Sequence, residues 1–257
     1  MKQFLTLLIA VSSFLIVNVS HANDQNKQTT VVLVHGAFAD GSSWNKVIPL
    51  LQKKGLKTIA VQNPLSSLEA DVAFTRRAIE AADGEVVLVG HSWGGMVITA
   101  AGNDPKVKSL VYVAGIAPPS QVSIKEILNE HHNVKKMPNV LGFSNPIIDE
   151  HGYIRLTEQT ITNYFAEDLE VSEAKLIAAT QGKLHKDTLN ETIDQVAWKS
   201  KPSWYIVSSK DQMIAPSLLR SMARNILAKT YELPTSHVPM LSKPAEVAKV
   251  ILEAASL

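Results

Sequence analysis

The segment Gly90–Gly95 (GHSWGG) carries the residue types that a nucleophilic serine requires. Ser92 stands in a Gly-x-Ser-x-Gly arrangement, directly after the apolar run 85–90 and directly before a helical pattern. Such a tight strand-to-helix turn strains the serine backbone, and side chains at Gly90 and Gly94 would clash with the neighbouring chain. The hydroxyl then projects above a helix N-terminus, where developing negative charge is favoured. The pattern predicts Ser92 as a nucleophile; a chance serine at such a junction is the alternative.

A second segment, Val34–Phe38 (VHGAF), follows the first strand-like run. Acyl transfer puts negative charge on a carbonyl oxygen, and two backbone N–H groups aimed at that oxygen stabilise it. In serine sites of the strand–turn–helix kind, one N–H belongs to the residue after the nucleophile and the other to a loop after an early strand. Here these are the amides of Trp93 and Ala37, which we predict to form the oxyanion hole. His35 and His91 are interpreted as structural hydrogen-bonding groups.

The base and its carboxylate are expected to follow the nucleophile in the order acid, then histidine. Asp211 comes just after the apolar run 203–208, and His237 comes just after the run 229–233. An open parallel sheet places its ligand sites at the carboxyl ends of its strands, so these side chains are expected to meet Ser92 there. His237 is predicted to take the proton from Ser92, and Asp211 is predicted to hold the imidazole in the right tautomer.

The remaining ionisable residues do not suggest another kind of chemistry. Asp187 and Asp194 are rival acids, but neither follows a strand, so both are interpreted as solvated surface groups. No pair of histidines has the H-x-x-x-H spacing of a helical zinc site. The chain has no cysteine, which excludes disulfides, thiolate nucleophiles and cysteine-ligated zinc. Neither a metal nor a cofactor is predicted.

Apolar runs alternate with amphipathic stretches along the chain. Six runs are predicted as strands, the first of them as a buried strand: 30–35, 57–62, 85–90, 108–113, 203–208 and 229–233. Helices are predicted at 44–54, 69–82, 96–101, 216–227 and 244–255. Strands that are apolar throughout and separated by helices indicate a parallel sheet covered on both faces. The predicted fold class is therefore α/β, with a mostly parallel six-stranded sheet.

A long insertion separates the fourth predicted strand from the fifth, from about residue 117 to 200. Helical patches at 123–130, 157–165 and 172–180 predict a helical cap over the carboxyl edge of the sheet. The insertion also holds aromatic residues for which two readings stay open, pocket lining and core packing: Phe143, Tyr153, Tyr164, Phe165 and Trp198.

The overall charge excludes some classes of partner. The 25 Lys and Arg residues nearly balance the 24 Asp and Glu residues, which leaves a net charge of +1. Without a basic excess there is no electrostatic footprint for nucleic acid and no polybasic run for an anionic membrane. The predicted partner is a small organic molecule, and a homodimer is retained as an alternative to the monomer.

The first 22 residues have the pattern of a signal peptide. A positive start at Lys2 precedes an apolar stretch, 4–19, and small residues stand at Ser20 and Ala22, so cleavage is expected after Ala22. A retained anchor helix is the alternative, although the apolar stretch is shorter than the ~20 residues of a bilayer span. We expect an exported protein, periplasmic or secreted, in which residues 23–257 form one domain without membrane attachment.

These motifs together resemble the α/β-hydrolase superfamily over nearly all of the chain after residue 22. Residues 237–244 (HVPMLSKP) are similar to the H-x-P-M-x-S-K-P tail of plant methylesterases and hydroxynitrile lyases, and residues 35–44 (HGAFADGSSW) resemble the opening of bacterial relatives. In such lyases a Lys follows the catalytic His and a Thr lies beside the oxyanion loop. Here these residues are Val238 and Ala37, so the resemblance favours ester hydrolysis over cyanohydrin cleavage.

The sequence therefore predicts a hydrolase that cleaves a carboxylic ester through an acyl-Ser92 intermediate. The resemblance further implies a small apolar or aromatic ester as substrate. Lactone hydrolysis and cofactor-free perhydrolysis use the same groups and stay open as alternatives. An alternative of another class is a receptor-like protein that uses the pocket to bind a ligand. Such a receptor would complete at most one slow turnover, whereas an enzyme would complete many.

Overall fold

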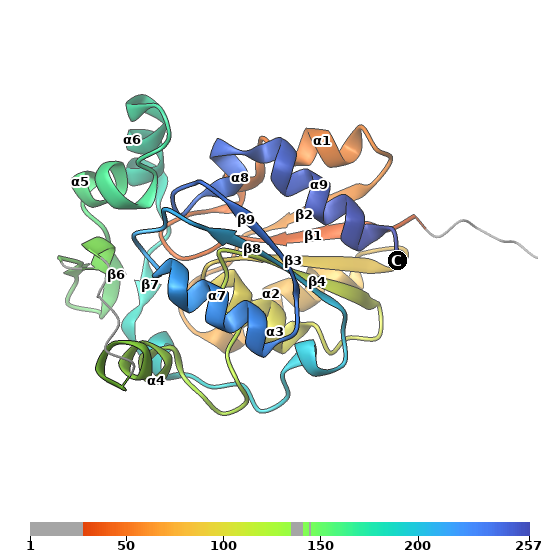
Figure 1. Ribbon diagram of the computed structural model, residues 1–257, viewed down its shortest axis with the longest axis horizontal. Coiled ribbons are helices and arrows are strands. Elements are labelled where there is room, and N and C mark those ends of the chain that lie inside the picture. The colour runs from red at the N-terminus through yellow and green to blue at the C-terminus, as the bar shows by residue number, and fades with distance from the viewer. Residues whose placement is uncertain (1–27, 135–140, 144) are drawn as a thin grey trace, which may run out of the picture.

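The computed structural model describes residues 28–134, 141–143 and 145–257 (Figure 1). The predicted signal peptide, residues 1–22, lies outside these residues. Among the described helices, none has both the length and the apolar character that crossing a bilayer requires.

The centre of the molecule is a six-stranded sheet in which every neighbouring pair is parallel. Its order is β2-β1-β3-β4-β8-β9. The strands are β1 (Thr30–Val34), β2 (Lys57–Val61), β3 (Val86–His91), β4 (Val107–Val113), β8 (Ser203–Ser208) and β9 (Lys229–Leu233). All six match predicted runs, and the α/β fold class is confirmed.

Burial along the strands follows their place in the sheet. The side chains of β1 and β3 are buried throughout, and they are mostly Val and Leu, which suits strands that are covered on both faces. The edge strands β2 and β9 keep exposed polar residues, such as Lys57 and Lys229. Charged edges of this kind oppose pairing with another sheet.

Helices cover both faces of the sheet, with α1 and α9 on one face and α2 and α3 on the other (Figure 1). These helices are α1 (Ile48–Gln52), α2 (Leu68–Glu80), α3 (Gly94–Ala101) and α9 (Pro244–Ala255). A further helix, α7 (Pro216–Asn225), connects β8 to β9. The helix predicted at 44–54 is divided: a 3₁₀ turn, η1 (Gly41–Trp44), precedes α1, and Pro49 stands in the first turn of α1, where proline is tolerated.

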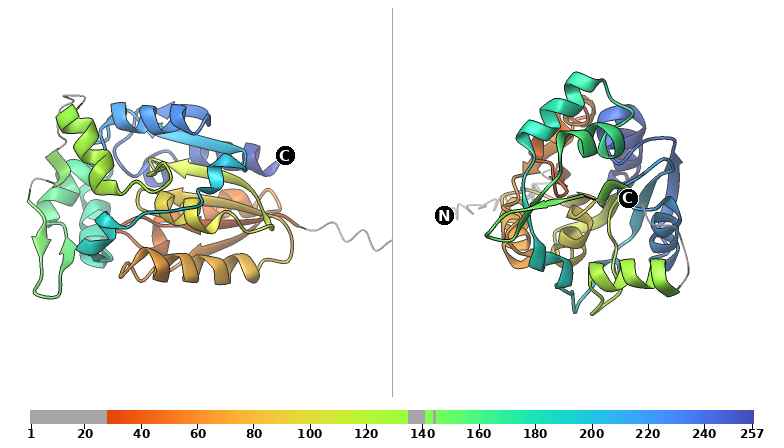
Figure 2. Two further views of the ribbon diagram at one scale, coloured as in Figure 1. Left: turned by 90° about the horizontal axis from the view of Figure 1, so that it is seen from below. Right: turned by 90° about the vertical axis from the view of Figure 1, so that its left-hand side faces the viewer.

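The insertion between β4 and β8 forms a cap at one end of the sheet (Figure 2). The predicted helical patches appear as α4 (Ile124–Asn129), α5 (Glu158–Thr160) continued by η4 (Ile161–Phe165), and α6 (Val171–Thr180). The cap also contains a three-stranded antiparallel sheet that has no counterpart in the sequence prediction: β5 (Ile147–Ile148), β6 (Tyr153–Arg155) and β7 (Leu184–His185). Strands of two or three residues are too short to produce a recognisable alternation.

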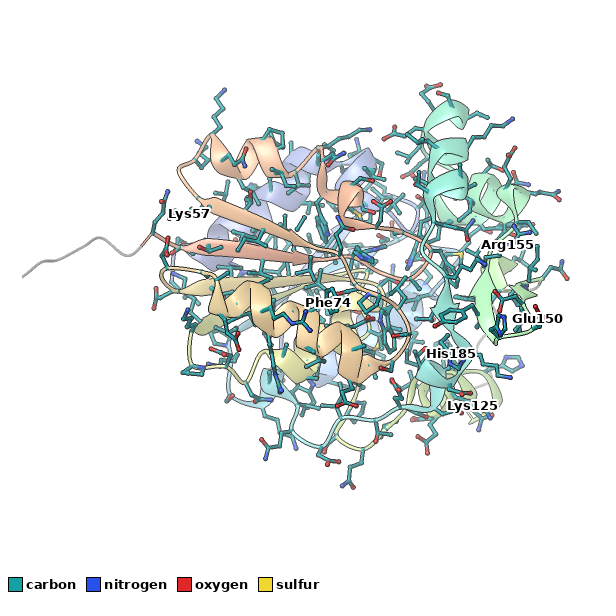
Figure 3. All side chains as sticks on the ribbon, turned by 180° about the vertical axis from the view of Figure 1, so that it is seen from behind. Lys57, Phe74, Lys125, Glu150, Arg155 and His185 are labelled. Carbon is teal, nitrogen blue, oxygen red and sulfur yellow. The ribbon has the colours of Figure 1, made fainter. Side chains whose placement is uncertain are left out.

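The remaining short helices are η2 (Glu130–Val134), η3 (Leu141–Phe143), η5 (Lys186–Asn190), η6 (Ala197–Lys199) and α8 (Pro239–Ser242). Charged side chains such as Lys57, Lys125 and Glu150 project from the surface away from the sheet (Figure 3). The buried strands and the inner faces of the helices form one continuous core. That core holds the carboxyl ends of the strands in fixed positions beneath the cap.

Candidate active site

Ser92 lies in the turn between β3 and α3, and its backbone is strained. Its φ is 49°, in the left-handed region that residues with side chains seldom adopt. A Cβ atom at Gly90 would lie 2.4 Å from the carbonyl oxygen of Gly94, and one at Gly94 would lie 2.6 Å from that of Val34. Both glycines are therefore required by the backbone that presents Ser92.

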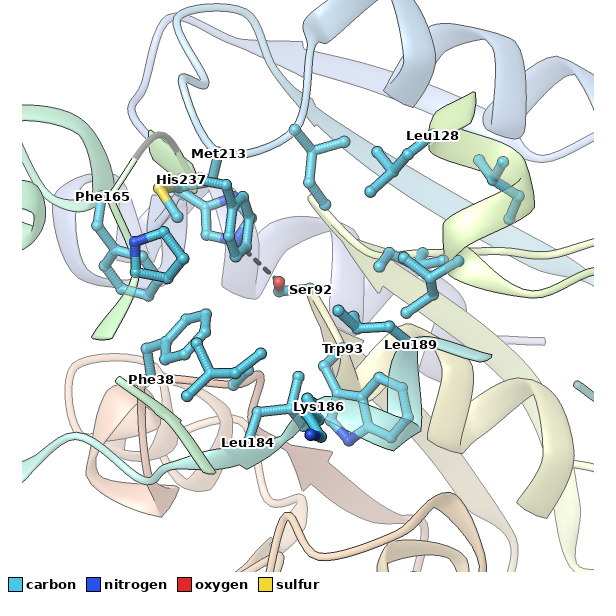
Figure 4. A pocket seen from close by; sticks show the side chains of 18 of the residues that line it. Phe38, Ser92, Trp93, Leu128, Phe165, Leu184, Lys186, Leu189, Met213 and His237 are labelled. Carbon is cyan, nitrogen blue, oxygen red and sulfur yellow. Dashed lines mark hydrogen bonds between the residues drawn. The ribbon is translucent and has the colours of Figure 1, made fainter. Parts of the chain in front are cut away.

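The three side chains predicted from the sequence lie together at the carboxyl ends of β3, β8 and β9. His237 Nε2 is 2.8 Å from Ser92 Oγ (Figure 4), and His237 Nδ1 is 2.7 Å from Asp211 Oδ2. A carboxylate only accepts hydrogen bonds, so Nδ1 carries the proton and Nε2 is left to accept the hydroxyl proton of Ser92. The arrangement can draw a proton from Ser92 onto His237.

Asp211 is held by its own loop. Its Oδ1 accepts the backbone N–H groups of Met213, at 2.7 Å, and Ile214, at 2.9 Å, which leaves Oδ2 for His237. The side chains of Asp211 and His237 are almost completely buried. Burial strengthens the hydrogen bond between them because little water competes for either partner.

The two loops that carry Asp211 and His237 also bind each other. The N–H of Ser209 donates to the carbonyl of Leu233 at 2.8 Å, and the N–H of Lys210 donates to the carbonyl of Thr235 at 3.1 Å. The hydroxyl of Thr235 adds a bond of 3.1 Å to Ser208 Oγ. Asp211 and His237 are thus positioned by two loops that are bonded to each other.

Ala37 and Trp93, the residues predicted to supply the oxyanion hole, line the same cavity as Ser92. In the described part of the chain, neither amide is among the hydrogen-bond donors, so both N–H groups are available to a bound oxygen. The loop that holds Ala37 packs tightly on the turn, because a Cβ atom at Gly36 would lie 2.7 Å from Ser92 Cβ. The N–H of Phe38 donates to the carbonyl of Gly182 in the cap at 3.0 Å.

His35 hydrogen-bonds within and beside its loop, as interpreted from the sequence. Its Nδ1 donates to the carbonyl of Gly36 at 2.8 Å, and its Nε2 accepts the N–H of Asn63 at 2.9 Å. Burial lowers its pKa below the ordinary value. A neutral His35 therefore fixes the shape of the loop that ends at Ala37.

His91 is also structural, and it acts on His237 directly. Its Nε2 lies 2.8 Å from the backbone carbonyl oxygen of His237, to which it donates, and the two rings are 4.8 Å apart. Burial pushes the pKa of His91 well below its ordinary value, and the neighbouring His237 adds to that effect. A neutral imidazole at this position holds the backbone of His237 without placing a second positive charge beside it.

Asp71 is a buried residue of the site region that the sequence prediction missed. It lies on the inner face of α2, where its Oδ2 accepts the indole N–H of Trp93 at 2.6 Å and its Oδ1 accepts the N–H of Leu65 at 2.8 Å. Burial raises its pKa to about 6, although both N–H donors oppose the shift. An acidic residue on the apolar face of a predicted helix is the signal that could have identified it.

The rival acids do not join the site. Asp187 is exposed and lies 3.7 Å from His185 in the cap, and Asp194 is exposed as well. Across the described residues, no three His, Cys, Asp or Glu side chains are grouped so as to hold a metal ion.

Ser92 and His237 open on a cavity of about 350 Å³ between the sheet and the cap. Its lining is mainly apolar, with Lys186 as an ammonium group at the edge (Figure 4). Two of the five cap aromatics, Phe143 and Phe165, line this cavity. The others pack elsewhere in the cap: the ring of Tyr153 lies 5.0 Å from that of His185, Tyr164 packs against the core, and the indole of Trp198 donates to Pro118.

The sequence of this chain matches a known protein family and several known proteins. The sequence pattern described as "Alpha/beta hydrolase family" matches residues 31–250. The chain is 26% identical to methylesterase 3 of Arabidopsis thaliana, over 91% of this chain and 98% of that protein. It is 28% identical to the alpha-hydroxynitrile lyase of the same plant, over 84% of this chain and 93% of that protein.

A solved structure supports the same assignment at the level of the fold. The crystal structure of polyneuridine aldehyde esterase superposes with a TM-score of 0.75, at 21% sequence identity, over 89% of this chain and 99% of that chain. The fold, the matched pattern and these relatives agree with the resemblance carried by residues 237–244. The protein belongs to the α/β-hydrolase family, and it is similar over most of its length to a plant methylesterase and a plant hydroxynitrile lyase.

Proposed function

We propose that the protein is a serine esterase that hydrolyses small carboxylic esters through an acyl-Ser92 intermediate. The observation that carries this proposal is the continuous hydrogen-bonded chain from Ser92 Oγ through His237 to Asp211, which opens on an apolar cavity. A hydroxyl paired with a base, and a base oriented by a buried carboxylate, are the requirements for nucleophilic acyl transfer.

The reaction begins when His237 Nε2 takes the hydroxyl proton and Ser92 Oγ attacks the ester carbonyl carbon. The N–H groups of Ala37 and Trp93 stabilise the oxyanion of the tetrahedral intermediate. His237 then gives its proton to the leaving alcohol as the C–O bond breaks, which leaves an acyl group on Ser92. His237 then takes a proton from a water molecule as that water attacks the acyl carbon. The bond from this carbon to Ser92 Oγ breaks as His237 returns the proton to Oγ, which releases the carboxylic acid and restores Ser92. Asp211 stabilises the imidazolium in both halves of the reaction.

The cavity supports an ester with an apolar acyl or alcohol group. Its volume of about 350 Å³ suits a small organic molecule, and its lining offers few hydrogen-bonding partners away from Ser92 and His237. Val238, which follows His237, is buried and supplies no ammonium group of the kind that hydroxynitrile lyases of this type use on cyanide. This supports hydrolysis rather than cyanohydrin cleavage.

The test is a steady-state panel of methyl and p-nitrophenyl esters of increasing acyl length, with a γ-lactone series beside them. We expect multiple turnovers on apolar esters, a loss of about 10³-fold or more in kcat for Ser92→Ala, and a severe loss for Asp211→Asn, because the wrong imidazole tautomer then faces Ser92. A preference for lactones would redirect the substrate class and keep the nucleophile. Wild-type turnover in Ser92→Ala, or a single slow turnover on every substrate, would refute the proposal.

We also propose that the enzyme works outside the cytoplasm, on the strength of the signal-peptide pattern in residues 1–22. Expression of the full chain in a bacterial host, followed by N-terminal sequencing of the protein released from the periplasm, is expected to give a chain that starts at Asn23. An uncleaved chain retained inside the cell would contradict this proposal.

A further inference from the structure

The cap segment Phe165–Asp168 lies against both loops that carry the proposed base and acid. At its far end, Asp168 binds Ser236, the residue immediately before His237. The N–H of Ser236 donates to Asp168 Oδ2 at 2.9 Å, and the Ser236 hydroxyl donates to Asp168 Oδ1. One carboxylate thus accepts two hydrogen bonds from the residue next to the base. We call residues 165–168 the cap clamp.

The neighbouring residue of the cap clamp reaches the acid loop. Glu167 Oε2 accepts a hydrogen bond from the side-chain amide of Gln212, the residue that follows Asp211. The backbone of Gln212 is bound to the cap as well, because its carbonyl accepts the N–H of Gly142 at 2.9 Å. Two adjacent carboxylates in the cap therefore hold the residues beside Asp211 and His237.

At its near end, the cap clamp touches the base itself. The Phe165 ring meets the His237 ring edge to face, with centroids 5.2 Å apart and planes at 67°, and Phe165 is buried. The backbone bends sharply after η4: Ala166 leaves helical geometry, with φ at −136°, while its N–H donates to the carbonyl of Ile161. The ring and the two carboxylates thus contact His237 and the residues beside His237 and Asp211.

We propose that the cap clamp is a positioning element for the reaction, in which Asp168 sets the place of His237 through Ser236. The inference rests on the proposed function and adds to it a role for a cap residue that is remote from the reacting atoms. His237 and Asp211 both stand on loops, and loops are the most mobile parts of a fold. A small displacement of a base is costly for rate, because proton transfer requires close and aligned partners.

The direct test compares Asp168→Ala with Glu170→Ala in the full-length enzyme. Both variants remove one negative charge. Glu170 lies two residues after Asp168, and its side chain makes no capping hydrogen bond at the start of α6, so Glu170→Ala serves as the matched control. We expect Asp168→Ala to lower kcat about five- to tenfold, with KM and the melting temperature close to those of Glu170→Ala. Asp168→Asn, which keeps one acceptor oxygen, is expected to recover most of kcat.

A double-mutant cycle tests the route through Ser236. If Asp168 acts through that residue, Ser236→Ala added to Asp168→Ala is expected to cost much less than Ser236→Ala alone. Full additivity of the two losses, a loss that falls wholly in KM, or equal kcat values for Asp168→Ala and Glu170→Ala would overturn the cap clamp as a positioning element.

A measurement independent of turnover separates this inference from the proposed function. The Nδ1 proton of His237, shared with buried Asp211, is expected to give a far-downfield proton NMR signal that broadens in Asp168→Ala and stays sharp in Glu170→Ala. If this difference appears in a protein that cleaves no ester, the esterase proposal fails while the cap clamp stands. If esters are cleaved and the signal is the same in both variants, the cap clamp fails alone.

Discussion

Each group of the Ser92 site is held by hydrogen bonds to neighbouring groups. Asp211 is held by two backbone amides, and His237 is held by Asp211 on its ring and by His91 on its carbonyl. Desolvation keeps His91 neutral, so it serves as a donor without competing for protons. The site therefore needs few adjustments when a substrate enters, which favours catalysis by preorganisation.

Asp71 is expected to make the stability of the protein depend on pH. Its pKa is raised by burial to about 6, from an ordinary value of 3.8. Between these values the unfolded chain has lost the proton while the folded protein still holds it, so the free energy of unfolding falls as pH rises. Relative to Asp71→Asn, the wild type is expected to lose about 2 to 3 kcal/mol of stability between about pH 4 and about pH 7.

Urea denaturation of the wild type and of Asp71→Asn across that pH range measures this difference. The stability gap between the two proteins is expected to change through the acid range and to level off above the raised pKa of Asp71. Parallel stability curves, or a wild type that gains stability relative to the variant as pH rises, would show that Asp71 is not protonated in the folded protein.

Among single residues, the sequence identified site residues that directly follow predicted strands and missed those that lie in a helix or in the cap. Ser92, Asp211 and His237 each stand just after an apolar run, so the rule for parallel sheets brought them together. Asp71 and Asp168 were not identified, because one lies within a helix and the other in a cap whose path over the sheet cannot be inferred from residue types. Their partners are 22 and 68 residues away in the chain.

Among the elements, the turn between β3 and α3 depends most on residue identity. At Gly94 a Cβ atom would lie 2.6 Å from the Val34 carbonyl oxygen and 2.9 Å from that of His35. These are backbone atoms in a packed core, so they cannot easily move aside. Gly94→Ala is therefore expected to cost about 2 to 4 kcal/mol of stability and to remove most of the activity.

Gly55→Ala is the matched control for that substitution. Gly55 differs from Gly94 in that its φ is positive, at +83°, and an added Cβ atom would meet nothing within 4 Å. Only the conformational cost of about 1 kcal/mol remains, and activity is expected to be unchanged. Thermal denaturation and ester turnover of the two variants test the comparison; equal effects would mean that crowding at the turn is not what requires Gly94.

The long strands and helices could be predicted from the sequence more accurately than the short ones. The six strands of the main sheet are five to seven residues long, and the apolar signal is strongest in the inner strands, such as β1 and β3, which are buried throughout. Strands β5 and β7 have only two residues each, and their pairing is set by the turn and by packing in the cap. The predicted helix at 44–54 divides because a 3₁₀ turn and α1 share the same apolar spacing.

At the level of the fold, the cap and the sheet together form the cavity at Ser92. The cavity is built from both layers: Ala37 and Trp93 come from the sheet side, and Phe143 and Phe165 come from the cap. The sequence indicated the position of the cap between β4 and β8 and the presence of helices in it. It could not indicate which aromatic residues face inwards, since that depends on how an irregular insertion packs on the sheet.

The whole-molecule architecture also explains why residues at positions 92, 211 and 237 can act together. Parallel strands all end at one edge of the sheet, so the loops after β3, β8 and β9 meet regardless of their separation in the chain. The shared core fixes that edge, and the cap covers it.

Acylation of Ser92 can be tested by mass spectrometry after rapid acid quenching of a reaction with p-nitrophenyl butyrate. We expect a mass increase of one butyryl group, located by peptide mapping on Ser92. The adduct is expected to be absent from Ser92→Ala and to form far more slowly in His237→Ala. A butyryl group on another residue, or an equal adduct in Ser92→Ala, would contradict acylation of Ser92.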